Sequence, residues 1–375
     1  MSQFTSRHMN EIYTKMGRDL PKVASFIAEE VNNAFWKRIN DDPQCVEKQY
    51  VDKKSQSSDY LKIKIAERLK EIAGRFAIEG KVGTVRPLGQ GFINDTYFVV
   101  LEGESEPRYI LQRKNHLVFP DVPAMMDNID RVTRHIKARV SDPLRETLTV
   151  IPVSDGKLCL QDDEGNWWAM CLFIKDSSSF DQASTPETAH QGGLGLGSFH
   201  RLVRDCDDPL TEVLKGCPNM PSHFVQCDAA LARDAAGRVG SLSEEISWIE
   251  SRRERVMELW KLVEDGTLPS RVTHNDTKIS NFLFDSHDGS LLCAIDLDTL
   301  MRSTVLNDVG DALRSYTNTG AEDDRDLSRV SMSREMYDAY MSGYLSVMEP
   351  YLTEAEKRYL PYSGCLITFE QVLRF

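Results

Sequence analysis

The stretch VTHNDTKISNFLFD, residues 272–285, places several polar residues in a short loop between two apolar runs. Asp276 lies five residues before Asn281, and Lys278 lies between them. A second acid, Asp296, follows the apolar run LLCAI. Carboxylate and amide oxygens are hard ligands that suit Mg²⁺, and a lysine can offset the charge of a phosphate group. These residue types at this spacing predict a site for metal-assisted chemistry on a phosphate.

The order of these residues is H-x-D-x-x-x-x-N followed by an acid, which is the order of the catalytic machinery of kinases. We interpret Asp276 as the group that orients a hydroxyl and accepts its proton, and Lys278 as a cation beside the transferring phosphate. Asn281 and Asp296 are the candidate metal ligands. His274 is interpreted as a structural hydrogen-bonding residue, because Asp276 already supplies a base. The alternative is a polar turn between two strands, which a lone His-x-Asp would favour.

A second candidate region, GQGFIND, joins two predicted strands. Backbone N–H groups around Gly89 and Gly91 could cover phosphates, and Asn94, which tolerates left-handed conformations, stands where a third glycine would be expected. The next strand ends in Arg113, whose fixed charge could also face phosphates. Asp127 on the following helix is either a partner of that arginine or an exposed surface acid. The alternative for the whole region is an ordinary turn.

Two further stretches raise questions of their own. Asp311 and Arg314 in NDVGDALR are three residues apart and share one helix face, so they form either a surface ion pair or a support for the catalytic loop. The run GGLGLGSFH, residues 192–200, follows a helical pattern rather than a strand and lacks the G-x-G-x-x-G register. We therefore interpret its glycines as sites of close helix packing.

The pattern along the chain predicts a bilobal α+β architecture. Residues 24–39 have the spacing of an amphipathic helix, and residues 53–60 have the composition of a linker. Strand-like runs then dominate up to about residue 174, and helical periodicity dominates after it. We expect an N-terminal extension over 1–60, a β-rich lobe on the nucleotide side over 61–174, and an α-rich lobe with the catalytic loop and acceptor site over 175–375.

Composition narrows the classes of function. The formal net charge of −13 disfavours nucleic-acid binding, which requires clustered Lys and Arg. No apolar run is long enough to span a membrane, and the N-terminal residues have no secretory signal. Eight cysteines without metal-ligand spacing indicate reduced thiols. We expect a cytoplasmic protein, monomeric or weakly dimeric, that acts on a small molecule and binds neither nucleic acid nor membrane.

The motifs GQGFINDTYFV, YILQRKN, VTHNDTKISNFLFD, CAIDLDT and NDVGDALRS resemble, in the same order, those of the aminoglycoside phosphotransferase superfamily of kinase-like small-molecule kinases. They are most similar to those of N-acetylhexosamine 1-kinases. The resemblance runs from about Ile72 to the C-terminus. It implies a protein-kinase-like fold, with a β-rich N-lobe and a mainly α-helical C-lobe, that uses ATP and Mg²⁺.

The resemblance also implies roles for particular residues. Asp276 would be the base, with Asn281 and Asp296 as metal ligands. Arg113 would lie near the phosphates, and the backbone of Leu172, Phe173 and Ile174 would meet adenine. The implied acceptor is a sugar or amino sugar, at the anomeric hydroxyl of an N-acetylhexosamine. The alternatives are a kinase of an amino alcohol or an aminoglycoside, or an inactive nucleotide-binding module.

Overall fold

A computed structural model describes residues 56–88, 93–180, 182–216, 219–320, 326, 328 and 330–374. The predicted helix at 24–39 lies outside the described residues, as do Gly89 and Gly91. The chain divides into two compact units. Of the described residues, the first unit contains those up to Asp127, Leu148–Ile174 and Asp326, and the second contains those within Asn128–Thr147, Lys175–Ala321 and Ser328–Phe375.

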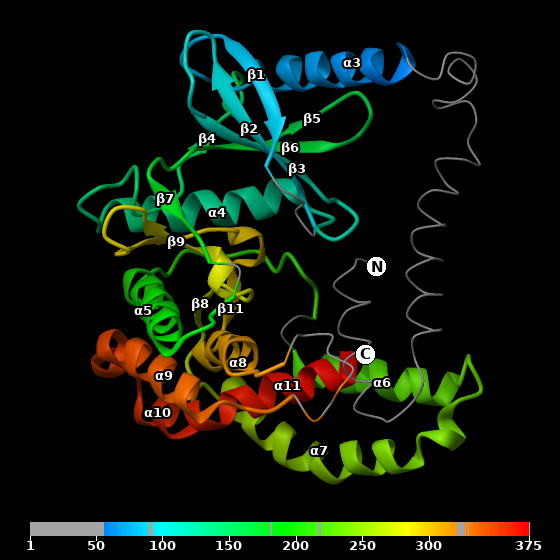
Figure 1. The fold of residues 1–375 in the computed structure, drawn as a ribbon. Coiled ribbons are helices and arrows are strands. Elements are labelled where there is room, and N and C mark those ends of the chain that lie inside the picture. Colours follow the sequence, from blue (N-terminus) through cyan, green and yellow to red (C-terminus); the bar gives the residue numbers. More distant parts are fainter. Residues whose placement is uncertain are drawn as a thin grey trace. The chain divides into compact units, whose positions relative to one another are not determined.

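The first unit is built on a six-stranded antiparallel sheet with the order β1-β2-β3-β6-β4, in which β5 also pairs with β6 (Figure 1). Its central strands lie in the runs TYFVVLEG, RYILQRK and NWWAMCLFI, whose β-branched and aromatic residues favour strands. The strands are β1 (Val82–Pro87), β2 (Asp95–Leu101), β3 (Tyr109–Lys114), β4 (Val150–Ile151), β5 (Leu160–Gln161) and β6 (Trp167–Leu172).

Helix α3 (Gln56–Ala73) covers one face of this sheet (Figure 1). Alternate residues of a strand point to the same face, so each strand contributes every second residue to the packed core. The core under α3 contains Leu69, Ile72 and Ala73 of the helix with Val99, Leu101, Tyr109, Leu111, Trp168 and Met170 of the strands. Truncating one of the large side chains here is expected to cost about 2–5 kcal/mol.

The interpretation of residues 53–60 as a linker is wrong from Gln56 onward, because α3 begins there. The stretch is polar, and polar composition alone suggested a loop. However, Ser and Asp are also favoured around helix N-termini, where their side chains can satisfy backbone N–H groups that have no partner in the helix. A polar stretch that leads into an amphipathic run can therefore be the first turn of the helix.

The second unit is mainly helical, with two small antiparallel sheets of order β10-β9-β7 and β11-β8. Helix α4 (Val122–Lys137) runs from the first unit into the second. The strands are β7 (Ser177–Ser178), β8 (Arg271–Thr273), β9 (Phe282–Asp285), β10 (Leu291–Ala294) and β11 (Met301–Ser303). The helices are α5 (Pro186–Val203), α6 (Met220–Arg233), α7 (Ser243–Glu264), α8 (Val305–Tyr316), α9 (Arg334–Met348), α10 (Glu354–Tyr359) and α11 (Ser363–Arg374). Short 3₁₀ turns are η2 (Val239–Ser241), η3 (Ile279–Asn281), η4 (Leu297–Thr299), η6 (Glu349–Tyr351) and η7 (Leu360–Tyr362).

The glycines of GGLGLG allow α5 and α9 to approach closely, as the sequence predicted. A Cβ on Gly193 would lie 2.0 Å from the carbonyl oxygen of Tyr340, and one on Gly343 would lie 2.1 Å from that of His190. Both distances are far below contact, so neither helix can carry a side chain at the crossing. The crossing holds α5 firmly, and α5 supplies His200 to the site described below.

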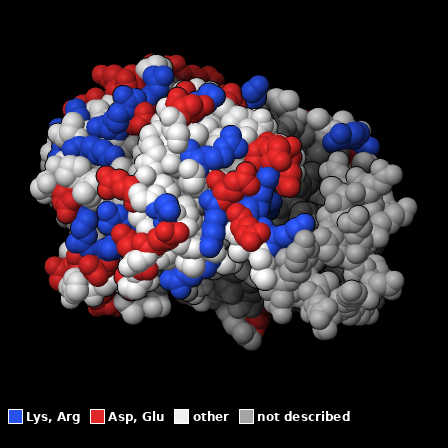
Figure 2. All heavy atoms as spheres, turned by 90° about the horizontal axis from the view of Figure 1, so that it is seen from above, with Lys and Arg blue, Asp and Glu red and all other residues white. Residues whose placement is uncertain are grey.

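Acidic and basic side chains alternate over the described part of the face in Figure 2, without an extended basic stripe there. A basic stripe is the usual footprint of nucleic-acid binding. Within the described residues, no helix has the length and apolar character needed to cross a membrane.

Candidate active site

The loop predicted to be catalytic, named the catalytic loop after that prediction, connects β8 to β9. It is made of His274–Lys278 followed by the 3₁₀ turn Ile279–Asn281. The strands on both sides are largely buried: Val272 and Phe282 have 1% and 0% of their surface exposed. The loop itself contains a left-handed residue, Asn275, with φ of 62°. A turn of this kind is tolerated when its backbone N–H groups find fixed acceptors.

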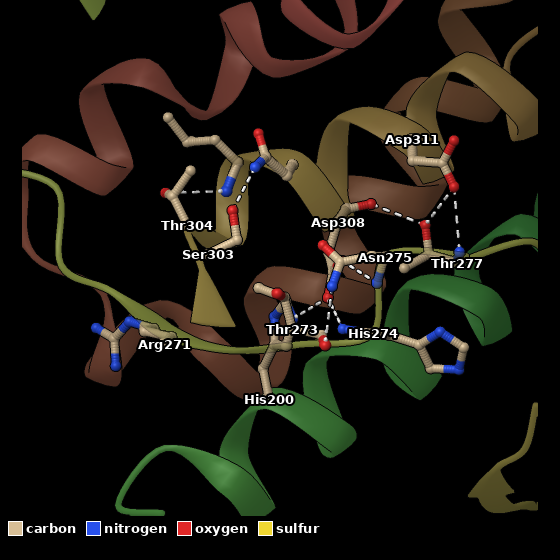
Figure 3. A network of polar contacts seen from close by, with 12 residues as sticks. His200, Arg271, Thr273, His274, Asn275, Thr277, Ser303, Thr304, Asp308 and Asp311 are labelled. Carbon is tan, nitrogen blue, oxygen red and sulfur yellow. Dashed lines mark hydrogen bonds and ion pairs between the residues drawn. The ribbon is translucent and has the colours of Figure 1, made fainter. Parts of the chain in front are cut away.

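Asp308 on α8 supplies those acceptors. Its carboxylate accepts the backbone N–H groups of His274 and Asn275, each over 2.7 Å, and it lies 2.8 Å from Nε2 of His200 on α5 (Figure 3). Asp308 is fully buried, so these partners replace its water. Sequence reasoning missed this residue. The available signal was the first acid in NDVGD, three residues before Asp311.

Asp311 supports the same loop one turn further along α8. Its carboxylate accepts the backbone N–H of Thr277 over 3.1 Å (Figure 3). It also accepts an N–H of Arg314 over 3.1 Å. The hydroxyl of Thr277 also donates to the carbonyl oxygen of Asp308 over 2.8 Å. Of the two interpretations offered by the sequence, support for the loop is therefore the correct one.

His274 is a structural residue, as expected. Its side chain is fully buried, and Nε2 donates to the carbonyl oxygen of Ile295 over 2.9 Å. Its own carbonyl oxygen accepts the hydroxyl of Thr299 over 2.6 Å. These bonds connect the loop to the segment that follows β10.

Asp276 is the partly exposed acid of the loop, with 26% of its side chain accessible. Lys278 donates from Nζ to Asp276 Oδ2 over 2.9 Å, and Asn281 donates from Nδ2 to the same oxygen over 3.0 Å. Within the described chain both bonds end on Oδ2, so Oδ1 is the oxygen that can accept a proton. Two donors on one oxygen fix the orientation of the carboxylate before any substrate arrives.

Lys278 is the cation at the centre of the acids. Burial alone would lower the pKa of Lys278, but the carboxylates of Asp276, Asp296 and Asp311 outweigh that effect and raise its pKa. The ammonium group therefore stays protonated at neutral pH. The same balance shows that all three carboxylates act electrostatically on one lysine.

The two candidate metal ligands lie at one end of the β9–β10 hairpin. Asn281 directly precedes β9, and Asp296 lies two residues after the end of β10. Ile295, between β10 and Asp296, donates its N–H to the carbonyl oxygen of Asn281 over 2.8 Å. Asp296 has φ of 56°, an unfavourable conformation for a residue with a side chain. Because the amide nitrogen of Asn281 is used on Asp276, its amide oxygen is the atom that can face a cation.

These donors fit Mg²⁺. An amide oxygen and a carboxylate are hard ligands, and Mg²⁺ usually takes only one or two protein carboxylates and completes its shell with water and phosphate oxygens. Among the described residues no group of three or more His, Cys, Asp or Glu is arranged to hold a metal ion. A cation at this hairpin would therefore complete its coordination with water or with phosphate oxygens.

The nucleotide-side candidates lie in the first unit. Asn94 is buried, and its side-chain oxygen accepts the N–H of Asn115, just after β3, over 3.1 Å. Arg113 forms an ion pair with Asp95 through Nε over 2.7 Å. Arg113 thus pairs with Asp95, which lies directly opposite it on β2, and not with Asp127. Asp127 is exposed, which was the alternative interpretation.

Arg113 and its neighbour Lys114 point to opposite faces of the sheet, as adjacent strand residues must. Arg113 is in register with Trp168, which belongs to the core under α3, and its side chain is 45% exposed. Lys114 is only 3% exposed, and its Nζ donates to Gln112 Oε1 over 2.7 Å. The face away from α3 therefore has its own cation.

The segment Leu172–Ile174 ends β6 and the first unit. The N–H of Leu172 donates to the carbonyl oxygen of Thr149 over 2.8 Å, and the N–H of Phe173 donates to that of Arg108 over 3.0 Å. Ile174 is buried. The backbone N–H groups of Leu172 and Phe173 therefore already have acceptors within the protein.

Comparison with known proteins identifies a family and a fold. The profile described as "Phosphotransferase enzyme family" matches residues 84–349, which is more than half of the 375 residues. An aminopropanol kinase associated with a microcompartment is similar in structure, with a TM-score of 0.57 and 17% identity over 82% of this chain and 88% of that one.

Two further solved structures share the fold. A spectinomycin phosphotransferase in complex with ADP and spectinomycin has a TM-score of 0.54 and 15% identity, over 82% of this chain and 86% of that one. An amicoumacin kinase in complex with AMP-PNP and Ca²⁺ has a TM-score of 0.52 and 15% identity, over 81% of this chain and 84% of that one. At these identities the likeness establishes the bilobal α+β fold.

Proposed function

Because the chain belongs to the phosphotransferase enzyme family, we propose that it transfers the γ-phosphoryl group of ATP to a hydroxyl group of a small molecule. The observation that carries this proposal is the Asp276 carboxylate, which Lys278 and Asn281 orient through one of its two oxygens. The loop that presents it is anchored from behind by Asp308 and Asp311. A base held in this way can act without reorganising.

In the proposed reaction the acceptor hydroxyl lies against Oδ1 of Asp276. Its oxygen forms a bond to the γ-phosphorus of ATP while the bond between that phosphorus and the β,γ-bridging oxygen breaks. The hydroxyl proton passes to Asp276, and ADP leaves. Lys278, whose pKa is raised by the surrounding carboxylates, stays charged and offsets the negative charge of the transferring group.

Asn281 and Asp296 would hold Mg²⁺, which suits their oxygen donors. When bound, the cation would neutralise charge on the phosphates of ATP. The protein's own contribution is to keep the two ligands at one end of the β9–β10 hairpin, where the bond between Ile295 and Asn281 connects the two strands. The fixed left-handed conformation of Asp296 defines the direction of its side chain.

On the nucleotide side we propose contacts from Gly89, Gly91 and Asn94 to the phosphates, and from the backbone of Leu172, Phe173 and Ile174 to adenine. Arg113 is the cation proposed from its position at the end of β3. Lys114 is the competing candidate, because it points to the opposite face of the sheet and is buried there. Substituting the two residues separately distinguishes them.

The proposed acceptor is a sugar or amino sugar, phosphorylated at the anomeric hydroxyl of an N-acetylhexosamine. The similarity of the motif set to that of N-acetylhexosamine 1-kinases supports this choice. The fold shared with an aminopropanol kinase favours an amino alcohol as the second candidate. An inactive nucleotide-binding module is disfavoured, because the set of Asp276, Asn281 and Asp296 is intact.

An ADP-release assay tests the proposal. The acceptor panel contains N-acetylhexosamines, other sugars, amino sugars, choline and aminoglycosides, with Asp276→Ala as the control enzyme. We expect the highest kcat/KM with an N-acetylhexosamine. Turnover only with choline or an aminoglycoside would change the acceptor class and keep the chemistry. ATP binding without ADP release for any acceptor would instead support the inactive module.

A further inference from the structure

Arg145 joins segments that are far apart in the sequence. Its Nη1 donates to Asp285 Oδ2 over 2.8 Å, and its Nη2 donates to the carbonyl oxygens of Lys175 and Asp176 over 3.2 and 3.1 Å. The arginine side chain is 32% exposed and that of Asp285 is 13% exposed, so the contacts are partly shielded from water. A planar guanidinium can serve these acceptors simultaneously in a fixed fork, which a lysine ammonium cannot.

The two carbonyl groups belong to the first residues of the second unit after Ile174. Asp176 has φ of 52°, in the left-handed region that is unfavourable for a residue with a Cβ. Its carbonyl oxygen also accepts the N–H of Ser286 over 2.9 Å. These bonds hold the chain in one conformation directly after the segment Leu172–Ile174.

The acid that Arg145 binds lies on the hairpin that carries the proposed metal ligands. Asp285 ends β9 and is in register with Ser177 of β7. At the other end of β9, Phe282 is in register with Ala294 of β10. Asn281 and Asp296 lie just beyond that end. One arginine therefore contacts the chain that leaves the proposed adenine segment and the far end of the metal-binding hairpin.

We propose that Arg145 is a positioning residue for the nucleotide, fixing the chain after Leu172–Ile174 to the hairpin that carries Asn281 and Asp296. The inference rests on the proposed function. In this role Arg145 acts through Asp285 and the carbonyl groups of Lys175 and Asp176. Without its fork, the chain after the adenine segment is held to the hairpin only by the β7–β9 pairing and the bond from Ser286 to Asp176. We expect this weaker connection to reduce ATP binding while acceptor binding changes little.

The test measures nucleotide and acceptor binding separately in the full chain. Arg145→Ala is compared with Arg145→Lys and with Asp285→Asn, which removes the partner charge but keeps the shape. The matched control is Arg253→Ala, because Arg253 is similarly exposed at 29% and pairs with Asp228 on α6. Calorimetry with Mg²⁺ and AMP-PNP gives Kd, steady-state kinetics give both KM values, and thermal melting reports folding.

We expect Arg145→Ala to raise the Kd for AMP-PNP and the KM for ATP roughly ten-fold and to change the acceptor KM by less than about two-fold. Arg145→Lys should recover only part of the loss, Asp285→Asn should reproduce it in a folded protein, and Arg253→Ala should leave nucleotide binding unchanged. Two results would overturn the role of Arg145 and leave the proposed function standing. One is unchanged nucleotide binding in Asp285→Asn and in any folded Arg145 variant, and the other is an equal rise in both KM values. A wild-type protein that binds no AMP-PNP and releases no ADP overturns the proposed function as well.

Discussion

The catalytic loop of the second unit and strand β3 of the first unit both carry adjacent polar residues, but they arrange them in opposite ways. In the loop, Lys278 and Asn281 fold back onto Asp276 through a 3₁₀ turn. On the strand, Arg113 and Lys114 point to opposite faces. The order of residues along a tight turn thus predicts well which side chains lie together. Along a strand, the same order predicts this only when it is known which face of the sheet each side chain points to.

The first and largest expected effect is on the loop. Asp276→Ala should lower kcat by about 10²–10⁴-fold, the usual contribution of a positioned base, and leave ATP affinity nearly intact. Asp288→Ala, in the turn of the same hairpin region, is the control. Steady-state kinetics measure the effect. A kcat for Asp276→Ala close to that of Asp288→Ala would remove Asp276 from the mechanism.

The support behind the loop gives the next effect. Asp308→Ala would leave two backbone N–H groups and His200 without their buried acceptor, so we expect the free energy of unfolding to fall by about 3–5 kcal/mol. Asp311→Ala, which loses one backbone partner, should cost less than half as much. Urea unfolding compares the two variants. Equal losses would show that the buried carboxylate is not the principal anchor.

Asp296→Ala should weaken both turnover and nucleotide binding, because this residue is a proposed ligand of the Mg²⁺ that would neutralise charge on the phosphates of ATP. We expect at least about a ten-fold loss of Mg²⁺-dependent affinity for ATP. Calorimetry with ATP in the presence and absence of Mg²⁺ measures this loss. An affinity and a Mg²⁺ dependence equal to those of the wild type would make Asp296 a purely structural residue.

The smallest effect tests the strand side of the comparison. Arg113→Met and Lys114→Met each remove one cation from neighbouring positions of β3, and the two side chains point to opposite faces of the sheet. If the phosphates lie on the face away from α3, Lys114→Met raises the KM for ATP several-fold, on the scale of a charged hydrogen bond, and Arg113→Met does not. The reverse result would assign the phosphates to Arg113, as the motif order predicts. Both variants are measured at saturating acceptor.

Much of the fold and of the loop can be predicted from the sequence because the signals are local. The spacing of Asp276 and Asn281, the strand runs and the glycines of α5 all act over a few residues. The contacts of Asp308 with His200 and of Arg145 with Asp285 join residues 108 and 140 positions apart, and no periodicity predicts such pairs. The start of α3 was missed because polar residues are typical of both linkers and helix N-termini.

The central claim is that Asp276 assists transfer of a phosphoryl group from ATP to a hydroxyl. Phosphorus NMR of the products, recorded for the wild type and for Asp276→Asn with Mg²⁺-ATP and the acceptor panel, tests it most directly. We predict a new phosphomonoester on one acceptor, in equal amount to ADP, with the wild type, and almost none with Asp276→Asn. Inorganic phosphate as the only product beside ADP, or equal phosphomonoester from both proteins, would contradict the claim.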